Sequence, residues 1–233
     1  MTSGDRAFEA PELIDVMDEA ENYNQHLLGL VLAWSQPFER LLDFGAGSGR
    51  VAGALQRAGR RIAAVEPDPR LRARIAALGI PTHPGLAELA DASVDGIYSL
   101  NVLEHIADDL AALREMRRAL RPGGGLFLYV PAFPLLYSSK DRRVGHVRRY
   151  RLPVLRARLR AAGFRPDRGG YADSLGFLAA FAFRFLGNAD GDLSRSAVRR
   201  YDRYVFPLSR RCDAITARFL GKNLVLTATA APA

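Results

Sequence analysis

The sequence is poor in cysteine and in long apolar runs. One thiol, Cys212, in 233 residues excludes an internal disulfide framework and leaves no set of thiolates for a structural zinc site. The longest apolar run, residues 174–187, is shorter than the roughly 20 residues of a membrane-spanning helix, and it contains Arg184. The first residues are acidic and polar, unlike a signal peptide. We therefore expect a cytoplasmic protein without a transmembrane segment.

Lysine is also scarce. Only Lys140 and Lys222 are lysines, so arginine supplies nearly all of the positive charge behind a net charge of +8. Arginine binds phosphate and carboxylate through a planar fork, although a bias toward arginine also follows from genome composition. Five arginines crowd one segment: Arg142, Arg143, Arg148, Arg149 and Arg151. A solvated basic face and a site for an anionic acceptor both remain open.

The length and a hydrophobic content of 48% fit one globular domain. From Arg40 onward, short apolar runs alternate with helical segments, a pattern that predicts a parallel sheet with helices on both faces. The predicted strands are 41–44, 61–65, a short one near 80, 94–100, 125–130 and 223–230; the predicted helices are an N-terminal one to about 34, 70–78, 108–120 and 153–162. We thus expect a Rossmann-like, doubly wound α/β fold with a mostly parallel seven-stranded sheet.

The predicted domain covers residues 1–233 as one unit. Its parts are an N-terminal helical cap (1–36), a core that would bind a nucleotide (37–131), a loop, helix and strand (132–171), a helical insert (172–221) and a last strand with a tail (222–233). The loop of about 20 residues after Pro131 is longer than a compact domain usually tolerates without a function. This loop and the insert are therefore the expected place of substrate binding.

A glycine-rich turn follows the first predicted strand, within Leu41–Arg50. Glycines at 45, 47 and 49 let the backbone approach a ligand closely. Arg50 stands where a dinucleotide fingerprint would have its last glycine, which argues mildly against NAD. Glu66 ends the second predicted strand, where a carboxylate can accept both hydroxyls of an adenosine ribose. A helix cap or a solvated turn is the alternative for this acid.

Three segments resemble the class I S-adenosylmethionine-dependent methyltransferases: DFGAGSGR, VEPDP and the block YSLNVLEHIADDLAALREMRRALRPGGGLFLYVPA. The segment ENYNQHLLG is similar to the subset that methylates small molecules and quinone or lipid precursors. The resemblance implies an enzyme that uses S-adenosylmethionine and releases S-adenosylhomocysteine. It implies these cofactor contacts: Tyr23, Asp43, Gly45, Ala46, Gly47, Gly49, Glu66, Pro67, Gly85, Leu86, Asn101 and Val102. Tyr23 would face the sulfonium or simply pack the N-terminal helix.

Methyl transfer is an in-line displacement, so the enzyme mainly positions and desolvates two reactants. A hydroxyl acceptor still benefits from a general base with a pKa near neutrality, which histidine supplies. By resemblance to the quinone-precursor enzymes, His146 is the candidate base and His105 orders the pocket; each histidine could instead only bind a backbone carbonyl. Some relatives hold a divalent metal with an E-V-x-E-H string, but Asn101 replaces the first acid here, so no metal is expected.

The expected acceptor contacts are Tyr137, Arg149, Tyr150, Phe177 and Phe181. The two phenylalanines are four residues apart and share a helix face, which is typical of core, of an apolar pocket wall or of a surface that touches lipid. We expect a small-molecule acceptor, with O-methylation favoured by resemblance. A peripheral lipid contact is compatible with this expectation, and so is a monomer or a homodimer.

Two alternatives remain open. The arginine content suggests a nucleic-acid methyltransferase, although the fourth predicted strand ends in SLNVLEHI and lacks the N-P-P-Y type of motif that grips a flipped base. No nucleic-acid partner is therefore expected. The second alternative is a non-enzymatic module that binds a nucleotide and acts as a sensor or partner subunit.

Overall fold

The computed structural model describes residues 19–186 and 195–231, with side chains of the 174–186 helix up to residue 182. The strands are β1 (Arg40–Phe44), β2 (Arg61–Val65), β3 (Thr82–His83), β4 (Val94–Leu100), β5 (Leu120–Pro131), β6 (Phe164–Ala172) and β7 (Asn223–Ala230). The α-helices are α2 (Glu21–Ser35), α3 (Arg50–Arg57), α4 (Pro69–Ala76), α5 (Asp109–Ala119), α6 (Ser139–Arg143), α7 (Leu152–Ala161), α8 (Ser174–Leu186), α9 (Arg195–Arg200) and α10 (Phe206–Thr216). Shorter helices are η1 (Leu86–Glu88), η2 (Leu103–His105), η3 (Pro134–Leu136) and the π-helix η4 (Tyr201–Val205).

The seven strands form one sheet in the order β3-β2-β1-β4-β5-β7-β6. β7 is antiparallel to both of its neighbours, and the other pairings are parallel. The predicted fold class is therefore confirmed. Each predicted strand is present, and the last strand spans the predicted residues 223–230.

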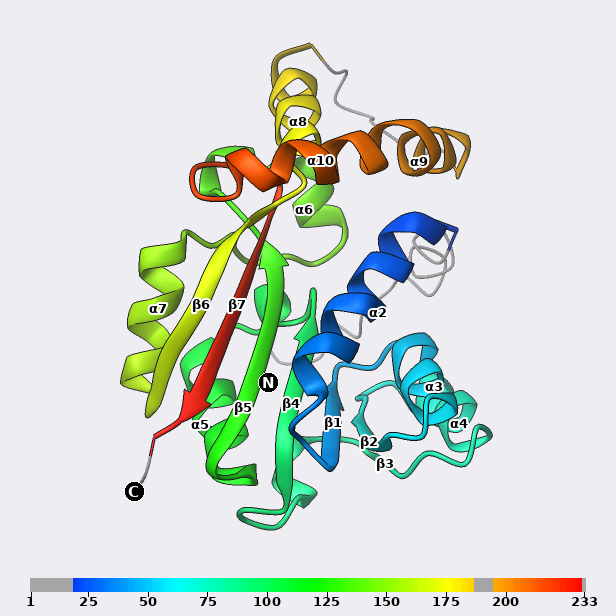
Figure 1. Ribbon diagram of the computed structural model, residues 1–233, viewed down its shortest axis with the longest axis vertical. Coiled ribbons are helices and arrows are strands. Elements are labelled where there is room, and N and C mark those ends of the chain that lie inside the picture. The colour runs from blue at the N-terminus through cyan, green and yellow to red at the C-terminus, as the bar shows by residue number, and fades with distance from the viewer. Residues whose placement is uncertain (1–18, 187–194, 232–233) are drawn as a thin grey trace, which may run out of the picture.

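The two faces of the sheet build two hydrophobic cores. Leu41 and Leu42 are neighbours on β1 and point to opposite faces, as successive strand residues do. Leu42 packs in the core under α5 and α7, whereas Leu41 packs in the core under α2, α3 and α4. The carboxyl ends of the parallel strands lie together at one edge of the sheet, on the side of the molecule that carries α8 and α10 (Figure 1).

Some boundaries differ from the prediction. β5 begins at Leu120, not at residue 125, because Leu120 pairs with Val94 before the register shifts at the glycines that follow. The predicted loop after Pro131 contains η3 and α6; the latter begins with a capping box formed by Ser138 and Asp141. The part of the predicted N-terminal helix before residue 19 lies outside the described residues.

The insert before β7 is helical, as predicted. It contributes α8, α9, η4 and α10, and α8 packs against α10 at one end of the molecule (Figure 1). Within the described ranges, no helix combines the length and the hydrophobicity needed to cross a bilayer.

Candidate functional site

The strand order changes direction beside β1: β2 and β3 lie on one side of it, and β4 and the later strands lie on the other. In open α/β sheets, ligands bind in the crevice at the carboxyl ends of strands at such a point. Most of the predicted cofactor residues lie at the carboxyl ends of β1, β2 and β4 or just after them, at this point of the sheet. Tyr23 lies on α2, and Gly85 and Leu86 follow β3.

The turn after β1 runs close to the end of β4. Gly45 donates its N–H to the carbonyl oxygen of Val65 at 2.8 Å and has a φ of 80°. A Cβ on Gly45 would lie 2.4 Å from Cγ2 of Val102, so only glycine fits at this approach. Gly45 and Val102, both predicted cofactor contacts, therefore lie against each other.

Glu66 links the glycine turn to the end of β2. Its carboxylate accepts the N–H of Gly47 at 2.8 Å and the N–H of Asp68 at 3.0 Å. The residue is 6% exposed, and burial raises the pKa of its carboxyl group. A carboxylate has about four acceptor positions, so two backbone donors leave capacity for the hydroxyls of a ribose.

Asp43 lies one residue before the carboxyl end of β1, and its side chain is buried, with 3% of the residue exposed. Burial raises the pKa of Asp43 to about 7, and the charge of Glu66 acts in the same direction. A cation placed beside this carboxyl group would favour its ionised form.

Tyr23 projects from α2 over the end of β4. The side-chain amide of Asn101 donates to the Tyr23 hydroxyl at 3.2 Å, and the Tyr23 ring meets the ring of Tyr129 edge-on at 6.1 Å. Burial raises the pKa of Tyr23 to about 12. Asn101 has a φ of 54°, which lies in the left-handed region. Residues other than glycine that are held in this region cluster at functional sites.

Asp202 in η4 fixes the start of α2, and sequence reasoning missed it. Its carboxylate accepts the N–H of Asn22 at 2.9 Å and the N–H of Tyr23 at 2.8 Å. It therefore caps a helix from a distant part of the chain, since Asn22 lies 180 positions before it. No local pattern points to such a partner.

The remaining predicted cofactor residues lie around this crevice. Leu86 is 7% exposed and belongs to the hydrophobic core, and its carbonyl oxygen accepts from Arg118. Gly85 immediately precedes η1. The carbonyl oxygen of Pro67 accepts from Arg72. Ala46 packs against the core that lies under α2. Their proposed contact with a nucleotide stays a prediction.

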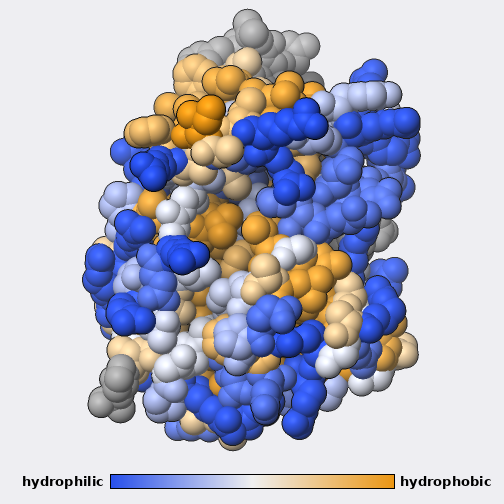
Figure 2. Space-filling view, in the orientation of Figure 1, coloured by the Kyte–Doolittle hydropathy of each residue, from blue (hydrophilic) through white to orange (hydrophobic). Residues whose placement is uncertain are grey.

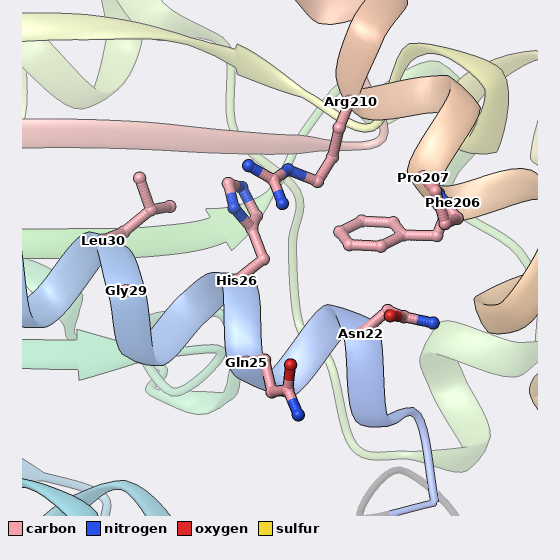
Figure 3. A pocket seen from close by; sticks show the side chains of 8 residues that line it. All are labelled: Asn22, Gln25, His26, Gly29, Leu30, Phe206, Pro207 and Arg210. Atoms are coloured by element: carbon pink, nitrogen blue, oxygen red, sulfur yellow. The ribbon is translucent and has the colours of Figure 1, made fainter.

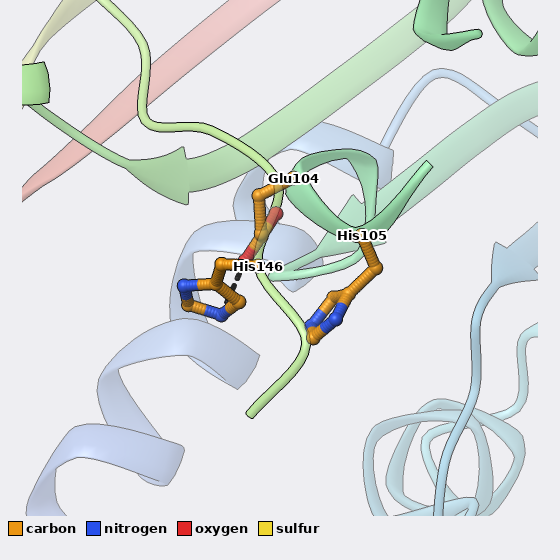
Figure 4. A group of neighbouring side chains, drawn as sticks. All are labelled: Glu104, His105 and His146. Atoms are coloured by element: carbon orange, nitrogen blue, oxygen red, sulfur yellow. Dashed lines mark ion pairs between the residues drawn. The ribbon is translucent and has the colours of Figure 1, made fainter. Parts of the chain in front are cut away.

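Glu104 lies in η2, directly after β4, and is fully buried. Neither of its carboxylate oxygens has a hydrogen-bond partner among residues 19–186 and 195–231, and Nε2 of His146 lies 3.7 Å from Oε1 (Figure 4). Burial raises the pKa of Glu104 to about 8. The group is therefore mostly protonated at neutral pH and can donate a hydrogen bond to a ligand.

His146 comes from the loop before α7 and is held by Asp141. Nδ1 of His146 lies 2.8 Å from Oδ1 of Asp141. Arg149 donates to the same carboxylate from Nε at 2.8 Å and from a terminal nitrogen at 3.1 Å. Burial alone would raise the pKa of Asp141, but the hydrogen bonds from His146 and Arg149 lower it to about 2. Sequence reasoning missed Asp141, although it stands only five positions before the predicted base.

His105 lies beside His146, with ring centroids 4.7 Å apart. Burial and the neighbouring imidazole lower the pKa of His105 to about 4, which keeps it neutral near pH 7. One atom each of Glu104, His105 and His146 lie within 4.8 Å of one another, so these three side chains could supply ligands to a metal ion (Figure 4). The expectation that no metal is required stays a prediction.

The other predicted acceptor contacts have partners within the chain. Tyr137 donates its hydroxyl to the carbonyl oxygen of His146 at 2.8 Å. Tyr150 is 1% exposed and donates to the carboxylate of Asp109 at 2.8 Å. Arg149 is paired with Asp141 as described, so Tyr150 and Arg149 would have to leave these partners to bind a substrate.

A row of aromatic rings leads from β6 to α8. Phe133 stacks on Tyr171 at 4.6 Å and meets Phe177 edge-on at 5.2 Å, and Phe177 stacks on Phe181 at 6.1 Å. Phe181 is 36% exposed. The predicted pair Phe177 and Phe181 thus belongs to a longer row of rings. Sequence reasoning missed its other two members, Phe133 and Tyr171.

A groove of about 380 Å³ separates α2 from α10. Figure 3 shows the imidazole of His26 pointing toward the guanidinium of Arg210 across it, beside the ring of Phe206. Burial and the charge of Arg210 lower the pKa of His26 to about 4. The Phe206 ring also meets the ring of Tyr23, with centroids 5.5 Å apart. The groove therefore lies next to Tyr23, which projects over the end of β4.

Comparisons with known proteins give a consistent result. A family model described as a methyltransferase domain matches residues 17–168, more than half of the chain. An uncharacterised methyltransferase of Mycolicibacterium gilvum is 30% identical over 195 residues, which cover 80% of this chain and 74% of the relative. A ubiquinone biosynthesis O-methyltransferase of Xanthomonas campestris is 33% identical over 102 residues, 40% of this chain and 43% of that protein. The chain thus matches less than half the length of the latter relative.

Solved structures share the fold. A SAM-dependent methyltransferase from Thermotoga maritima superimposes with a TM-score of 0.64 at 19% identity, covering 95% of each chain. One chain of the complex between the Haloferax volcanii Trm112 methyltransferase activator and a methyltransferase gives a TM-score of 0.63 at 17% identity, covering 97% of this chain and 99% of that one. At these identities the likeness is one of fold.

Proposed function

Since the chain belongs to the family of proteins with a methyltransferase domain, we propose that it transfers a methyl group from S-adenosylmethionine to an oxygen atom of a small-molecule acceptor. The observation that carries the acceptor half of this proposal is the placement of buried Glu104 beside the Asp141–His146 pair, directly after β4.

The crevice supports the cofactor half of the proposal. S-adenosylmethionine carries its methyl group on a positively charged sulfonium, which makes the methyl carbon the electrophile. Because Gly45 has no Cβ, the turn after β1 can lie against Val102 after β4, where the cofactor would bind. The carboxylate of Glu66 has acceptor positions left for the ribose hydroxyls. Asp43, with its pKa near 7, would ionise fully beside the positive charges of the methionine part.

His146 is the base in this proposal. Asp141 accepts from Nδ1, which leaves the lone pair on Nε2, the nitrogen that faces Glu104. An acceptor hydroxyl that binds between Nε2 and the crevice gives its proton to Nε2 as its oxygen attacks the methyl carbon. Bound S-adenosylmethionine would supply the methyl group for the new C–O bond, and its sulfur would keep the electron pair of the broken C–S bond. Glu104, protonated, orients the acceptor by donating a hydrogen bond.

The aromatic row indicates the kind of acceptor. Phe133, Tyr171 and Phe177 offer ring faces and edges to an apolar molecule. Arg148 and Arg149, which an anionic acceptor would need, pair instead with Asp109 and Asp141. We therefore favour a neutral, aromatic or otherwise apolar molecule that carries a hydroxyl group over a phosphorylated one.

The cofactor half is tested by calorimetry with S-adenosylmethionine, S-adenosylhomocysteine and NAD. We expect the sulfur nucleotides to bind and Glu66→Ala to weaken them, whereas Glu39→Ala, a change of an exposed glutamate, leaves binding unchanged. Binding of NAD without binding of either sulfur nucleotide would reject the proposal.

The acceptor half is tested with methyl-labelled cofactor and a panel of phenols, aliphatic alcohols and amines. We expect label in phenolic or alcoholic products, identified by mass spectrometry as methyl ethers. Methylated amines as the sole products would refute O-methylation while leaving the cofactor half intact.

A further inference from the structure

An exposed apolar stripe runs along η4, α10 and the turn after it. It consists of Tyr204, Leu208, Ile215 and Phe219, which are 67%, 51%, 80% and 72% exposed. Leu208 and Ile215 lie seven positions apart and share one face of α10. Tyr204 lies in η4, just before α10, and Phe219 lies in the turn just after it. Below, these four residues are called the α10 stripe.

The α10 stripe stands out from the rest of the surface. Ile215, Phe219 and Tyr204 are the three most exposed large hydrophobic side chains among the described residues. Leu178, 54% exposed, extends the apolar surface onto α8, which packs against α10. Figure 2 shows hydrophobic residues gathered at the end of the molecule that carries α8 and α10, bordered by hydrophilic ones. Single exposed apolar residues need no explanation, but a contiguous set points to a partner.

The same segment is strongly basic. Between residues 195 and 222 it carries Arg195, Arg199, Arg200, Arg203, Arg210, Arg211, Arg218 and Lys222. Its two acids are engaged within the chain: Asp202 caps α2, and Asp213 accepts the N–H groups of Asp173 and Ser174. Arg211 on α10 and Arg218 in the turn after it are both exposed. Arg211 lies three positions after Leu208, and Arg218 directly precedes Phe219.

An exposed apolar helix face bordered by arginines is the arrangement by which a helix lies in the interface of an anionic membrane. A second copy of this chain would bring the same basic charges together, which disfavours self-association through this face. RNA would attract the arginines, and its bases can stack on Tyr204 and Phe219, but Leu208 and Ile215, half of the stripe, offer bases neither a ring nor a hydrogen bond. Binding of RNA is therefore one outcome of the test.

We propose that the α10 stripe docks the protein on an anionic lipid surface, with the apolar side chains in the headgroup region and Arg211 and Arg218 on the lipid phosphates. This inference does not depend on the proposed function. The aromatic row ends on α8, which packs against α10, so the docked surface and the end of this row belong to the same end of the molecule.

The test is cosedimentation of the full chain with phosphatidylcholine vesicles, with and without about a quarter of phosphatidylglycerol. We expect binding to the anionic vesicles only, and weakening as salt is raised. Ile215→Ser combined with Phe219→Ser should weaken binding at least about tenfold. Arg211→Gln combined with Arg218→Gln should weaken it roughly tenfold or more and flatten the salt dependence.

A matched control is Leu78→Ser combined with Val154→Ser, the same kind of change at exposed residues away from the stripe. It should bind vesicles like the wild type, and all variants should keep the wild-type Tm and affinity for S-adenosylhomocysteine. Unaltered cofactor binding separates loss of docking from loss of the proposed function.

Three results would overturn the docking proposal. The first is absence of wild-type binding to anionic vesicles. The second is equal binding by wild type and Ile215→Ser/Phe219→Ser. The third is that the wild type does not bind vesicles but forms a dimer or binds RNA, and that Ile215→Ser/Phe219→Ser abolishes this association.

Discussion

Nδ1 of His146 lies 2.8 Å from Oδ1 of Asp141, and this contact turns the other ring nitrogen toward Glu104. A carboxylate that accepts from one nitrogen of an imidazole fixes its tautomer and its orientation. Asp141 is itself held by Arg149 and by the N–H of Ser138, so the imidazole rests on a rigid support. The reactivity of His146 should therefore depend on a residue that does not touch the substrate.

Asp141→Asn tests this dependence. The amide can donate to Nδ1 and so favour the tautomer with the proton on Nε2, which cannot accept a proton from a hydroxyl. We expect kcat to fall about 100-fold or more, the usual range for a lost general base, with little change in affinity for S-adenosylhomocysteine. Asp167→Asn, an acid on β6 paired with Arg165, serves as the control and should retain wild-type kcat. Equal kcat for wild type and Asp141→Asn would remove Asp141 from the mechanism.

Glu104→Gln should change how stability depends on pH. Burial raises the pKa of Glu104 from 4.5 to about 8, so the folded state holds this proton more tightly than the unfolded chain does. The wild type therefore loses stability as pH rises from about 4.5 to about 8, and glutamine, which has no such proton, avoids the loss. We expect the variant to gain roughly 5 kcal/mol over the wild type between the two pKa values of Glu104, since each pKa unit corresponds to about 1.4 kcal/mol; urea unfolding at several pH values measures this gain. If the free energy of unfolding depended on pH in the same way for both proteins, Glu104 would be ionised in the folded protein across this range.

Gly45→Ala should lower the stability of the fold at the turn that borders the crevice. Its positive φ costs an L-residue about 1 kcal/mol, and the new Cβ would meet Val102, a clash of a kind that costs a further 1–3 kcal/mol or so. Gly59→Ala is the matched control, because Gly59 has a φ of 79° with open space around it. We expect a larger drop in Tm for Gly45→Ala, partly restored by Val102→Ala. Equal drops for the two glycine variants would indicate that backbone strain alone sets the cost.

Asp202→Ala removes the cap of α2. Loss of a capping side chain costs about 1–2 kcal/mol, and Tyr23, whose N–H is one of the capped groups, should become less ordered. We expect a lower Tm together with a weaker affinity for S-adenosylmethionine. Asp108→Ala removes the cap of α5 and should lower the Tm without altering that affinity. A Tm decrease with unchanged cofactor affinity for Asp202→Ala would mean that α2 does not cover the cofactor.

Removal of metal ions should leave the activity unchanged. Glu104, His105 and His146 could supply ligands, but the in-line transfer to an oxygen positioned by His146 does not require a Lewis acid. The measurement is kcat after dialysis against EDTA, compared with the untreated protein. A loss of activity that zinc or magnesium restores would make these three side chains a functional metal site.

The sequence predicted what depends on local patterns. The turn of Gly45, the acid Glu66 and the block after β4 are each contiguous with a strand whose apolar run is visible, and the parallel topology then brings them together. The mostly parallel sheet and the presence of a last strand followed from the same alternation of runs, whereas the antiparallel pairing of β7 did not.

Other parts of the site depend on contacts between distant segments. Asp202 reaches Tyr23 across 179 positions, and Phe133 meets Tyr171 and Phe177 from separate elements. Tyr150 was predicted to contact substrate, and its burial against Asp109 arises from tertiary packing that periodicity does not encode. Such residues become apparent only when the chain is folded.

The position of β7 in the sheet has a consequence for biosynthesis. β7 is the final strand along the chain, yet it lies between β5 and β6, and β6 pairs with no other strand. A nascent chain that has not released residue 230 from the ribosome must hold β6 without a partner and leave one edge of β5 open. Chaperones that shield unpaired strands should therefore associate with the nascent chain while β6 is exposed and β7 is not, and stop codons shortly before Asn223 should yield aggregates in place of a smaller folded domain.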